Sequence, residues 1–484
     1  MWKNIAILLL ASALAALLVL RQRAPQPPLI TPHQVEQPIE PPQPPAKPEP
    51  HPITTLLQAA RANPDLAGAA IGFCLLNDKG EVILDDNAST AFIPASSLKT
   101  LTTATALELL GPDFHFTTEL KASAPIQNGE ITGDLVILGG GDPMLKMDDL
   151  KAWAAELKQR GLLRITGGVR ADTSLFSGSL YSDYWNWGDI GNGYGSGVSG
   201  LNLNHNRYIV MLRAGAAEGA PADFLGINLE IPHAAWKNEV TTGPSGSGDG
   251  VVIHGGEITT AIHLRGTVPL GAAKFQAKGA VPDPARFIEH HFRALLTAAG
   301  IQVGTATTAT AQPSYSLLQH DSPALIDIIK SIHATSDNLE TECVFRMLGL
   351  KQGKPPAEII RQHWKQRGLD FTGLRMEDGC GLARADYIRP LDLARLQYLA
   401  GTGPQGPAYK ASLLSKDGLS WKGGAMSGVR TFTGYAKTKS GPEYSYALMI
   451  NHFTHGSAVS ALSQQVMDAM LGLEPPAAHT FESR

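Results

Sequence analysis

The sequence is short of cysteine and has no excess of either charge. Three of its 484 residues are cysteines, Cys74, Cys343 and Cys380, and their wide spacing gives neither a disulfide framework nor a paired zinc motif. We expect free and mostly buried thiols, with one disulfide plus one free thiol as the alternative. The formal net charge is −4, with both signs spread along the chain. No basic stripe therefore points to nucleic acid as a partner.

Several common catalytic signatures are also missing or incomplete. The chain has no GxSxG elbow of the kind that carries a serine–histidine–aspartate triad. A literal GxGxxG match at 195–200 is followed by alternating residues rather than by a helix, so it predicts a loop and not a dinucleotide site. The adjacent His290 and His291 point in different directions on a predicted helix and are poor joint metal ligands. We expect neither a metal nor an organic cofactor.

Long apolar runs are absent except at the N-terminus. The 16 residues from Ile5 to Leu20 are apolar or small and are followed by Arg21 and Arg23. As a helix they would span about 24 Å, slightly short of a hydrocarbon core of about 30 Å. This fits a signal peptide or a short anchor. An uncleaved anchor is favoured, because the small-x-small triplets lie inside the run. Residues 24–52 then hold twelve prolines and predict a stiff spacer.

The folded body begins near residue 53, and its predicted secondary structure changes in character twice along the chain. Helical and strand patterns alternate at both ends, whereas residues 116–315 read as short strands between glycine-rich turns with one clear helix at 283–299. This pattern predicts one domain interrupted by a β-rich insertion. The expected segments are an anchor or signal (1–23), a linker (24–52), the first part of the main domain (53–115), the insertion (116–315), the second part (316–475) and a tail (476–484). The expected helices of the main domain are 56–62, 96–110, 324–333, 339–350, 390–399 and 458–471, and its strands include 69–76, 81–84, 429–436 and 444–452.

The first chemical candidate is the pair Ser96 and Lys99 at the start of a predicted helix. Three residues apart, the two side chains share one helix face, and the helix N-terminus favours an alkoxide. Lysine can act as a base only if its pKa falls toward neutrality, which burial beside another cation would achieve. The spacing alone is weak, because an ordinary helix N-terminus often has such a pair.

Two further motifs follow the insertion. Ser336-Asp337-Asn338 joins two helical stretches, where its hydroxyl and amide could enter a cleft, although the triplet could equally be a simple helix cap. Lys422-Gly423-Gly424-Ala425 precedes the final hairpin, where a lysine beside bare backbone could meet a substrate carboxylate. The N–H groups of Ala425 and Ser96 could then stabilise an oxyanion, each such donor being worth roughly 3 to 4 kcal/mol. The alternative is a glycine-rich turn with a solvated lysine.

Taken together, SxxK, SDN and KxG in this order resemble the penicillin-recognising serine enzymes. Within them the chain looks like the low-molecular-mass class C penicillin-binding proteins, the D-alanyl-D-alanine carboxypeptidase/endopeptidases. The resemblance covers about residues 53–475. Further stretches that look like this family are Leu138–Pro143, Val198–Asn202, Asp378–Leu382 and Ser427–Val429.

The resemblance implies a fold and a reaction. The fold is an α/β (α+β) serine DD-peptidase or β-lactamase-like transpeptidase domain, an antiparallel sheet flanked by helices, with the insertion forming two further nested domains. Such an enzyme cleaves D-alanyl bonds in peptidoglycan stem peptides or cross-links and is acylated by β-lactam antibiotics. It implies an extracytoplasmic protein, held at the membrane here by residues 5–20.

The resemblance also implies a role for each matching residue. Ser96 becomes acylated, and Lys99 takes its proton. Ser336 relays a proton to the leaving group, and Asn338 binds the substrate amide. Lys422 neighbours this relay and, with the backbone at Gly423 and Gly424, helps to hold the terminal carboxylate.

Two positions depart from the family pattern. Gly423 stands where threonine or serine is usual, which removes a hydroxyl that helps to bind the terminal carboxylate, and Cys380 replaces a usual serine. We therefore expect a weaker preference for a free D-alanine terminus and relatively more endopeptidase action. The alternatives are a β-lactamase or esterase on the same fold and a catalytically weakened wall-binding protein.

Overall fold

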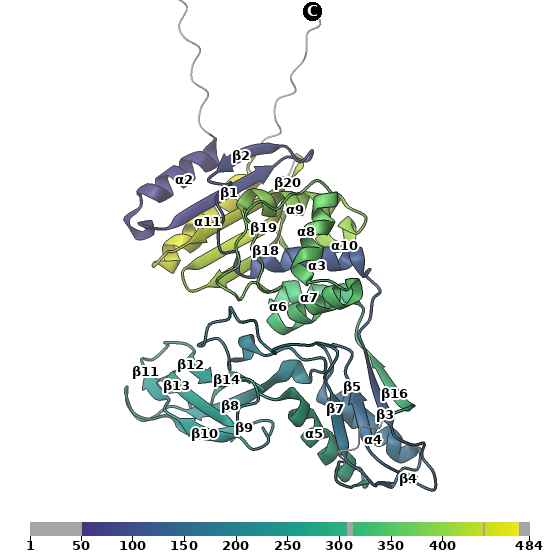
Figure 1. Cartoon of the computed structure of the whole chain (residues 1–484). Coiled ribbons are helices and arrows are strands. Elements are labelled where there is room, and N and C mark those ends of the chain that lie inside the picture. Colours follow the sequence, from purple (N-terminus) through teal and green to yellow (C-terminus); the bar gives the residue numbers. More distant parts are fainter. Residues whose placement is uncertain (1–50, 307–312, 439–440, 474–484) are drawn as a thin grey trace, which may run out of the picture. The chain divides into compact units, whose positions relative to one another are not determined.

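The computed structural model describes residues 51–306, 313–438 and 441–473 (Figure 1). The expected anchor, most of the proline-rich spacer and the C-terminal tail lie outside the described residues. Within those ranges, no helix combines the length and the hydropathy needed to cross a membrane.

A six-stranded antiparallel sheet is built from both ends of the chain. Its order is β17-β18-β19-β20-β1-β2, so the N-terminal hairpin adds to the edge of the C-terminal meander. The middle of the chain contributes no strand to this sheet. The strands are β1 (Ala70–Leu76), β2 (Val82–Asp86), β17 (Leu414–Lys416), β18 (Leu419–Met426), β19 (Val429–Lys437) and β20 (Glu443–Asn451).

The sheet has an apolar layer on each face because side chains alternate along its strands. On β20, Tyr446 and Leu448 join the cluster that contains α2 (Pro52–Ala62) and α11 (Gly456–Leu471). Ala447 and Met449 face the opposite cluster, which contains the remaining helices of this part of the fold (Figure 1). These helices are α3 (Lys99–Leu109), α6 (Leu325–Thr335), α7 (Asn338–Gln352), α8 (Pro356–Gln366), α9 (Pro390–Thr402) and α10 (Gly406–Ser412). The expected antiparallel sheet flanked by helices is confirmed.

The segment between α3 and α6 forms four smaller sheets around a hydrophobic cluster of its own. Its helices, α4 (Met147–Gln159) and α5 (Pro284–Ala298), pack in that cluster through Trp153 and Phe292. Its strands are β3 (Thr117–Ala122), β4 (Glu130–Ile131), β5 (Leu135–Leu138), β6 (Arg164–Ile165), β7 (Val169–Asp172), β8 (Arg207–Arg213), β9 (Asp223–Ile227), β10 (Ala235–Asn238), β11 (Thr241–Gly243), β12 (Gly250–His254), β13 (Ala261–Pro269), β14 (Phe275–Ala280), β15 (Gln302–Val303) and β16 (Tyr315–Asp321).

Three sequence expectations need correction. The insertion has a second long helix, α4, which buries Leu150, Trp153 and Leu157 at helical spacing against the same cluster as α5. The helix expected at 96–110 begins as a 3-10 turn, Ala95–Leu98, and becomes α-helical only from Lys99. Among the short strands expected within 116–315, the alternating segment 251–264 is expected to be one strand but is two, because the chain turns between β12 and β13 and pairs them antiparallel.

The three cysteines are free and buried, as expected from their spacing. Burial raises the pKa of the Cys74 thiol to about 12. The thiols of Cys343 and Cys380 also have pKa values well above the ordinary value, because both are fully buried. All three therefore stay protonated and unreactive near neutral pH.

Candidate active site

The turn Ala95–Leu98 places Ser96 at the entrance to α3. Ala95 has a φ of 46°, a left-handed conformation that is uncommon outside glycine, and Ser97 Oγ donates back to the Pro94 carbonyl at 2.8 Å. The turn is tightened by these features, and Ser96 stays partly exposed while Ser97 is fully buried. Of the two neighbouring hydroxyls, the one at 96 is the one presented to solvent.

The Lys99 ammonium is fully buried and reaches three oxygen atoms. It donates to Ser96 Oγ at 3.1 Å, to Asn338 Oδ1 at 2.6 Å and to the Cys380 carbonyl at 2.7 Å. None of these acceptors carries a formal charge. The amine thus lies within proton-transfer distance of the Ser96 hydroxyl, in the position that the first motif requires.

The loop that follows α8 holds Lys99 through its backbone. Asp378 Oδ1 accepts the N–H groups of Cys380 at 3.0 Å and Gly381 at 2.6 Å, and Asp378 Oδ2 accepts the indole N–H of Trp185 at 2.8 Å. This buried carboxylate fixes the carbonyl of Cys380 toward Lys99. What residue 380 supplies here is its main-chain oxygen, so cysteine in place of serine leaves the contact to Lys99 intact.

The second motif serves both as a helix cap and as a source of side chains for the site. Asp337 is the N-cap of α7, and its Oδ1 accepts the Glu340 N–H at 3.0 Å. Ser336 closes α6 with a left-handed φ of 60°, and Asn338 turns its amide toward Lys99. Capping by the middle residue therefore orients the flanking hydroxyl and amide toward the site. The Nδ2 of Asn338 donates to the Tyr194 carbonyl at 2.8 Å.

Lys422 on β18 forms the second buried cation of the site. Its ammonium donates to Ser336 Oγ at 2.9 Å and to the Gly423 carbonyl at 2.8 Å. Burial, followed by repulsion from Lys99, lowers the pKa of Lys422 to about 7. The side chain can therefore exchange a proton with Ser336 near neutral pH.

Gly424 allows β18 to approach the serine turn. A Cβ at this position would lie 2.4 Å from Thr431 Oγ1 and 2.8 Å from the Ser96 nitrogen. Gly423 differs, because a Cβ there would have its nearest neighbour, Phe432, at 3.5 Å. Gly423 could therefore be replaced without a clash at Cβ, whereas Gly424 could not. The pairing of N–H groups from Ser96 and Ala425 as an oxyanion hole stays a prediction.

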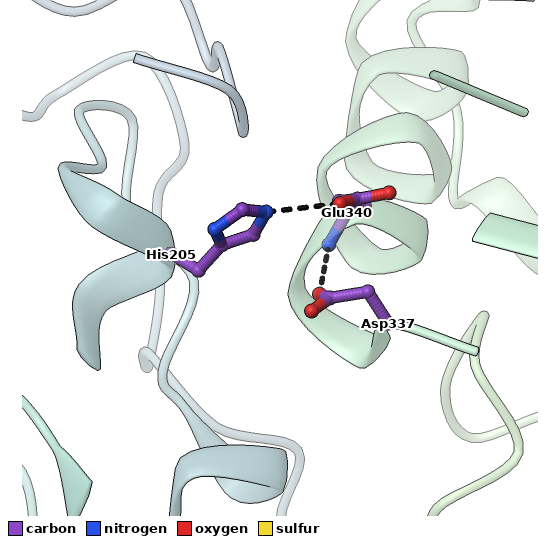
Figure 2. A group of neighbouring side chains, drawn as sticks. All are labelled: His205, Asp337 and Glu340. Carbon is purple, nitrogen blue, oxygen red and sulfur yellow. Dashed lines mark hydrogen bonds and ion pairs between the residues drawn. The ribbon is translucent and has the colours of Figure 1, made fainter. Parts of the chain in front are cut away.

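Two residues of the insertion form ion pairs with the first turn of α7 and its N-cap. Figure 2 shows His205 reaching Glu340, whose Oε1 lies 2.9 Å from His205 Nε2, with Asp337 beside them. Arg207 Nη1 lies 2.6 Å from Asp337 Oδ2, and its charge with that of His205 holds the pKa of this carboxyl below its ordinary value despite burial.

The ligand atoms of His205, Asp337 and Glu340 lie close enough together to hold a metal ion. Both Asp337 oxygens already accept hydrogen bonds, one of them from the cation Arg207. We therefore interpret the group as an ion-pair network. A second such group, Glu342, Asp378 and Cys380, is fully buried, and Asp378 in it is occupied by backbone and indole N–H donors.

Several contributors to the site carry no sequence signal. His333, buried between Thr103 and Ser412, was not singled out, and burial with repulsion from Lys422 lowers its pKa to about 3, so it is neutral. Arg207 and Tyr194 come from the insertion, on either side of the family-like stretch Val198–Asn202, but neither belongs to one of the three motifs. Asp378 lies in a stretch that resembles the family, which is the one signal that could have identified it.

The fold and the lysine-flanked serine place the chain in the class of penicillin-recognising serine enzymes. The family model described as "D-Ala-D-Ala carboxypeptidase 3 (S13) family" matches residues 53–414 of this chain. The chain belongs to this family.

Named relatives agree with this assignment. A D-alanyl-D-alanine carboxypeptidase of Actinomadura sp. (strain R39) is 29% identical over 449 residues, covering 85% of this chain and 82% of that protein. D-alanyl-D-alanine carboxypeptidase DacB of Haemophilus influenzae is 25% identical over 426 residues, covering 81% and 88%. Among solved structures, penicillin binding protein 4 (dacB) from Haemophilus influenzae superposes with a TM-score of 0.75 at 22% identity, covering 87% of this chain and 99% of that one.

Proposed function

We propose that the protein is a serine DD-peptidase that hydrolyses D-alanyl peptide bonds in peptidoglycan stem peptides or cross-links through an acyl-enzyme on Ser96. The observation that carries the proposal is the position of Lys99 Nζ, 3.1 Å from Ser96 Oγ and buried among neutral oxygens. Membership of the D-Ala-D-Ala carboxypeptidase 3 (S13) family supports the same reaction.

The reaction runs in two half-reactions. Ser96 Oγ bonds to the carbonyl carbon as Lys99 accepts the hydroxyl proton, and the backbone N–H groups of Ser96 and Ala425 take the oxyanion. The C–N bond then breaks, and Ser336 passes a proton, drawn from Lys422, to the departing amine. Water attacks the ester and gives a proton through Ser336 to Lys422, while the ester C–O bond breaks and Lys99 returns its proton to Ser96 Oγ. Each proton taken up in the first half-reaction is returned in the second.

The substrate ends are held by residues around this centre. The Asn338 amide contacts Lys99 beside the nucleophile. From this position it also binds the peptide group on the acyl side of the scissile bond. Lys422, with the backbone at Gly423 and Gly424, holds the terminal carboxylate. We propose that β-lactams acylate the same serine, because their ring amide mimics the scissile bond. The stretches 53–115 and 316–475 form the catalytic domain, and 116–315 forms two nested insertion domains.

The proposed location is extracytoplasmic, at the outer face of the cytoplasmic membrane or in the periplasm, with residues 5–20 as the anchor. The apolar run and the spacer of twelve prolines support this location. Such a spacer would keep the folded body away from the bilayer and near the wall.

Labelling with a fluorescent penicillin tests the function. We expect stable covalent labelling of the full chain, lost in Ser96→Ala and kept in Ser97→Ala, together with release of D-alanine from a D-Ala-D-Ala peptide. Rapid turnover of the label would indicate a β-lactamase or esterase instead. Absence of labelling in the wild type would indicate a wall-binding protein with a decayed site.

A further inference from the structure

A cavity lies within the insertion, and its lining includes none of the candidate active-site residues. It has a volume of about 360 Å³ and is lined by Trp187, His254, Thr259, His263, Arg265 and small residues between them. Trp187 is 69% exposed, the highest value among the exposed large hydrophobic side chains of the described residues. An indole left this open at the edge of a cavity offers a large apolar surface at little entropic cost.

The indole of Trp187 is held in place despite its exposure. It stacks on the His254 ring, with centroids 6.2 Å apart and planes inclined by 20°. The loop behind it is fastened to two strands, because Asn192 Oδ1 accepts the Ile253 N–H at 2.9 Å and the Gly191 carbonyl accepts the Ala280 N–H at 2.8 Å. The indole therefore forms part of a preorganised surface.

Polar groups that can bind hydroxyl and amide groups surround this surface. His254 Nδ1 is buried and makes no hydrogen bond within the described residues. Burial and the nearby charge of Arg265 lower the pKa of His254, so its ring is neutral at pH 7. His263 Nε2 lies 2.6 Å from Glu239 Oε2, and the exposed Arg265, whose Nε lies 3.9 Å from the same oxygen, lines the cavity together with Thr259. The lining thus combines one flat apolar face with several uncharged and cationic partners.

We propose that this cavity binds the amino-sugar glycan strand of peptidoglycan, with the C–H face of a pyranose ring packed on Trp187. This inference rests on the proposed function. A pyranose has one apolar C–H face and an equatorial rim of hydroxyl and acetamido groups, and the cavity offers a matching surface to each. Arg265 pairs with a carboxylate of the attached stem peptide. Glu239, which does not line the cavity, lies 3.9 Å from Arg265 Nε and is also within ion-pair distance of Lys237 and His263.

The path of the chain connects this cavity to the catalytic residues. Trp187 lies seven positions before Tyr194, whose carbonyl accepts a hydrogen bond from Asn338 Nδ2. Fully extended, seven residues span at most about 25 Å. The segment that carries Trp187 is therefore anchored beside the candidate site within seven positions of the indole. The insertion would bind the strand while the main domain cleaves its branch.

The test uses glycan strands from which an amidase has removed the stem peptides. The full chain in mild detergent should bind these strands, and Trp187→Ala should weaken the affinity about tenfold, whereas Trp187→Tyr retains most of it. Tyr184→Ala is the matched control, because Tyr184 is an exposed aromatic of the same loop that does not line the cavity. Isolated stem peptide should bind wild type and Trp187→Ala equally.

Activity assays separate this proposal from the proposed function. Trp187→Ala should cleave a short soluble D-Ala-D-Ala peptide at the wild-type rate, yet release less product from intact peptidoglycan. Failure of the wild type on the short peptide would contradict the proposed function, whereas the glycan-binding result does not depend on turnover. Equal affinity of wild type and Trp187→Ala for peptide-free strands, or no binding by the wild type, would overturn the proposal. A Trp187-dependent affinity for stem peptide alone would also overturn it.

Discussion

Arg207 and Asp337 join the insertion to the catalytic domain through an ion pair of 2.6 Å between Nη1 and Oδ2. Asp337 is at the same time the cap of α7, and its two chain neighbours, Ser336 and Asn338, contact Lys422 and Lys99. The insertion thereby supports two groups to which the proposed mechanism assigns roles, although it contributes no residue of the three motifs.

Removing Arg207 should therefore affect both stability and acylation. Arg207→Gln leaves the buried Asp337 carboxylate without its cation, and we expect a loss of about 2 to 4 kcal/mol in unfolding free energy. Penicillin acylation should slow as well, because Ser336 and Asn338 lose their support. Arg213→Gln on the same strand removes an exposed pair with Asp223 and should cost less than about 1 kcal/mol.

The double variant Arg207→Gln/Asp337→Asn completes this test. Removing both charges eliminates the unpaired carboxylate, so part of the lost acylation rate should return. Denaturant unfolding and the second-order acylation rate measure the two effects. Equal effects of Arg207→Gln and Arg213→Gln would show that the pair has no role in positioning the site.

The low pKa of Lys422 predicts a pH dependence of substrate binding. Its pKa is about 7 in the folded protein, against an ordinary value of 10.5, so the side chain loses its positive charge above pH 7. The kcat/KM should fall above about pH 7 both for a peptide with a free terminal carboxylate and for the same peptide with an amidated terminus, because Lys422 also supplies the leaving-group proton. The fall should be steeper for the free carboxylate. Equal falls in the two profiles would argue against carboxylate binding by Lys422.

The same shift predicts how stability depends on pH. Below pH 7 the lysine is protonated in the folded and the unfolded chain alike. Between about pH 7 and 10.5 the unfolded chain binds more protons at this site, so this group makes the unfolding free energy rise with pH. Lys422→Met should remove this contribution. The difference in unfolding free energy between wild type and variant, measured at pH 7 and pH 9, provides the check.

The two neighbouring glycines should respond differently to alanine. In Gly424→Ala the new Cβ would meet Thr431 Oγ1 and the Ser96 backbone, so the serine turn must shift. A displacement of about 1 Å is enough to cost about 10²-fold in acylation rate. Gly423→Ala is the control, because its Cβ makes ordinary contacts and the rate should change little. Similar losses in both variants would disprove the assignment of close contact to position 424.

Restoring a hydroxyl at position 423 should alter substrate preference. Gly423→Thr places a donor beside the proposed carboxylate site, and a hydrogen bond to a charged group contributes about 1.5 to 3 kcal/mol. We expect the ratio of carboxypeptidase to endopeptidase activity to increase about tenfold. Gly423→Ala adds the carbon without the hydroxyl and should leave the ratio unchanged. An unchanged ratio in Gly423→Thr would refute this account of the departure from the family pattern.

The sequence predicted the parts of the fold that local pattern determines. Apolar runs and breaker residues predicted a strand at 69–76 and a helix at 390–399, and the structure has them at 70–76 and 390–402. Helix α4 was missed because glycine-rich β texture surrounds it, although its Leu150, Trp153 and Leu157 have helical spacing. Helical spacing in a short segment is a weak signal when the neighbouring segments look like strands and glycine-rich turns, and here those neighbours led to the wrong prediction.

The site was predictable only through its motifs, which lie on three distant segments. The family resemblance implied the contact of Lys422 with Ser336 but did not specify that of Lys99 with Asn338. The support from Arg207 and from the Tyr194 carbonyl was not predicted either, because a backbone oxygen and an arginine of the insertion leave no spacing rule in a sequence. Such contacts depend on how the insertion returns to the domain, which is a property of the tertiary fold.

The pairing of β1 with β20 has a consequence for biosynthesis. These strands are neighbours in the sheet, from the pair Ala70 and Asn451 to the pair Leu76 and Ser445, yet they stand at opposite ends of the described chain. A ribosome must translate through residue 451 before the sheet can close, and contacts of such sequence separation form slowly. The nascent chain thus holds Ser96 early but gains Lys422 and the sheet behind it late. The proposed site therefore cannot assemble until β18, β19 and β20 have been made.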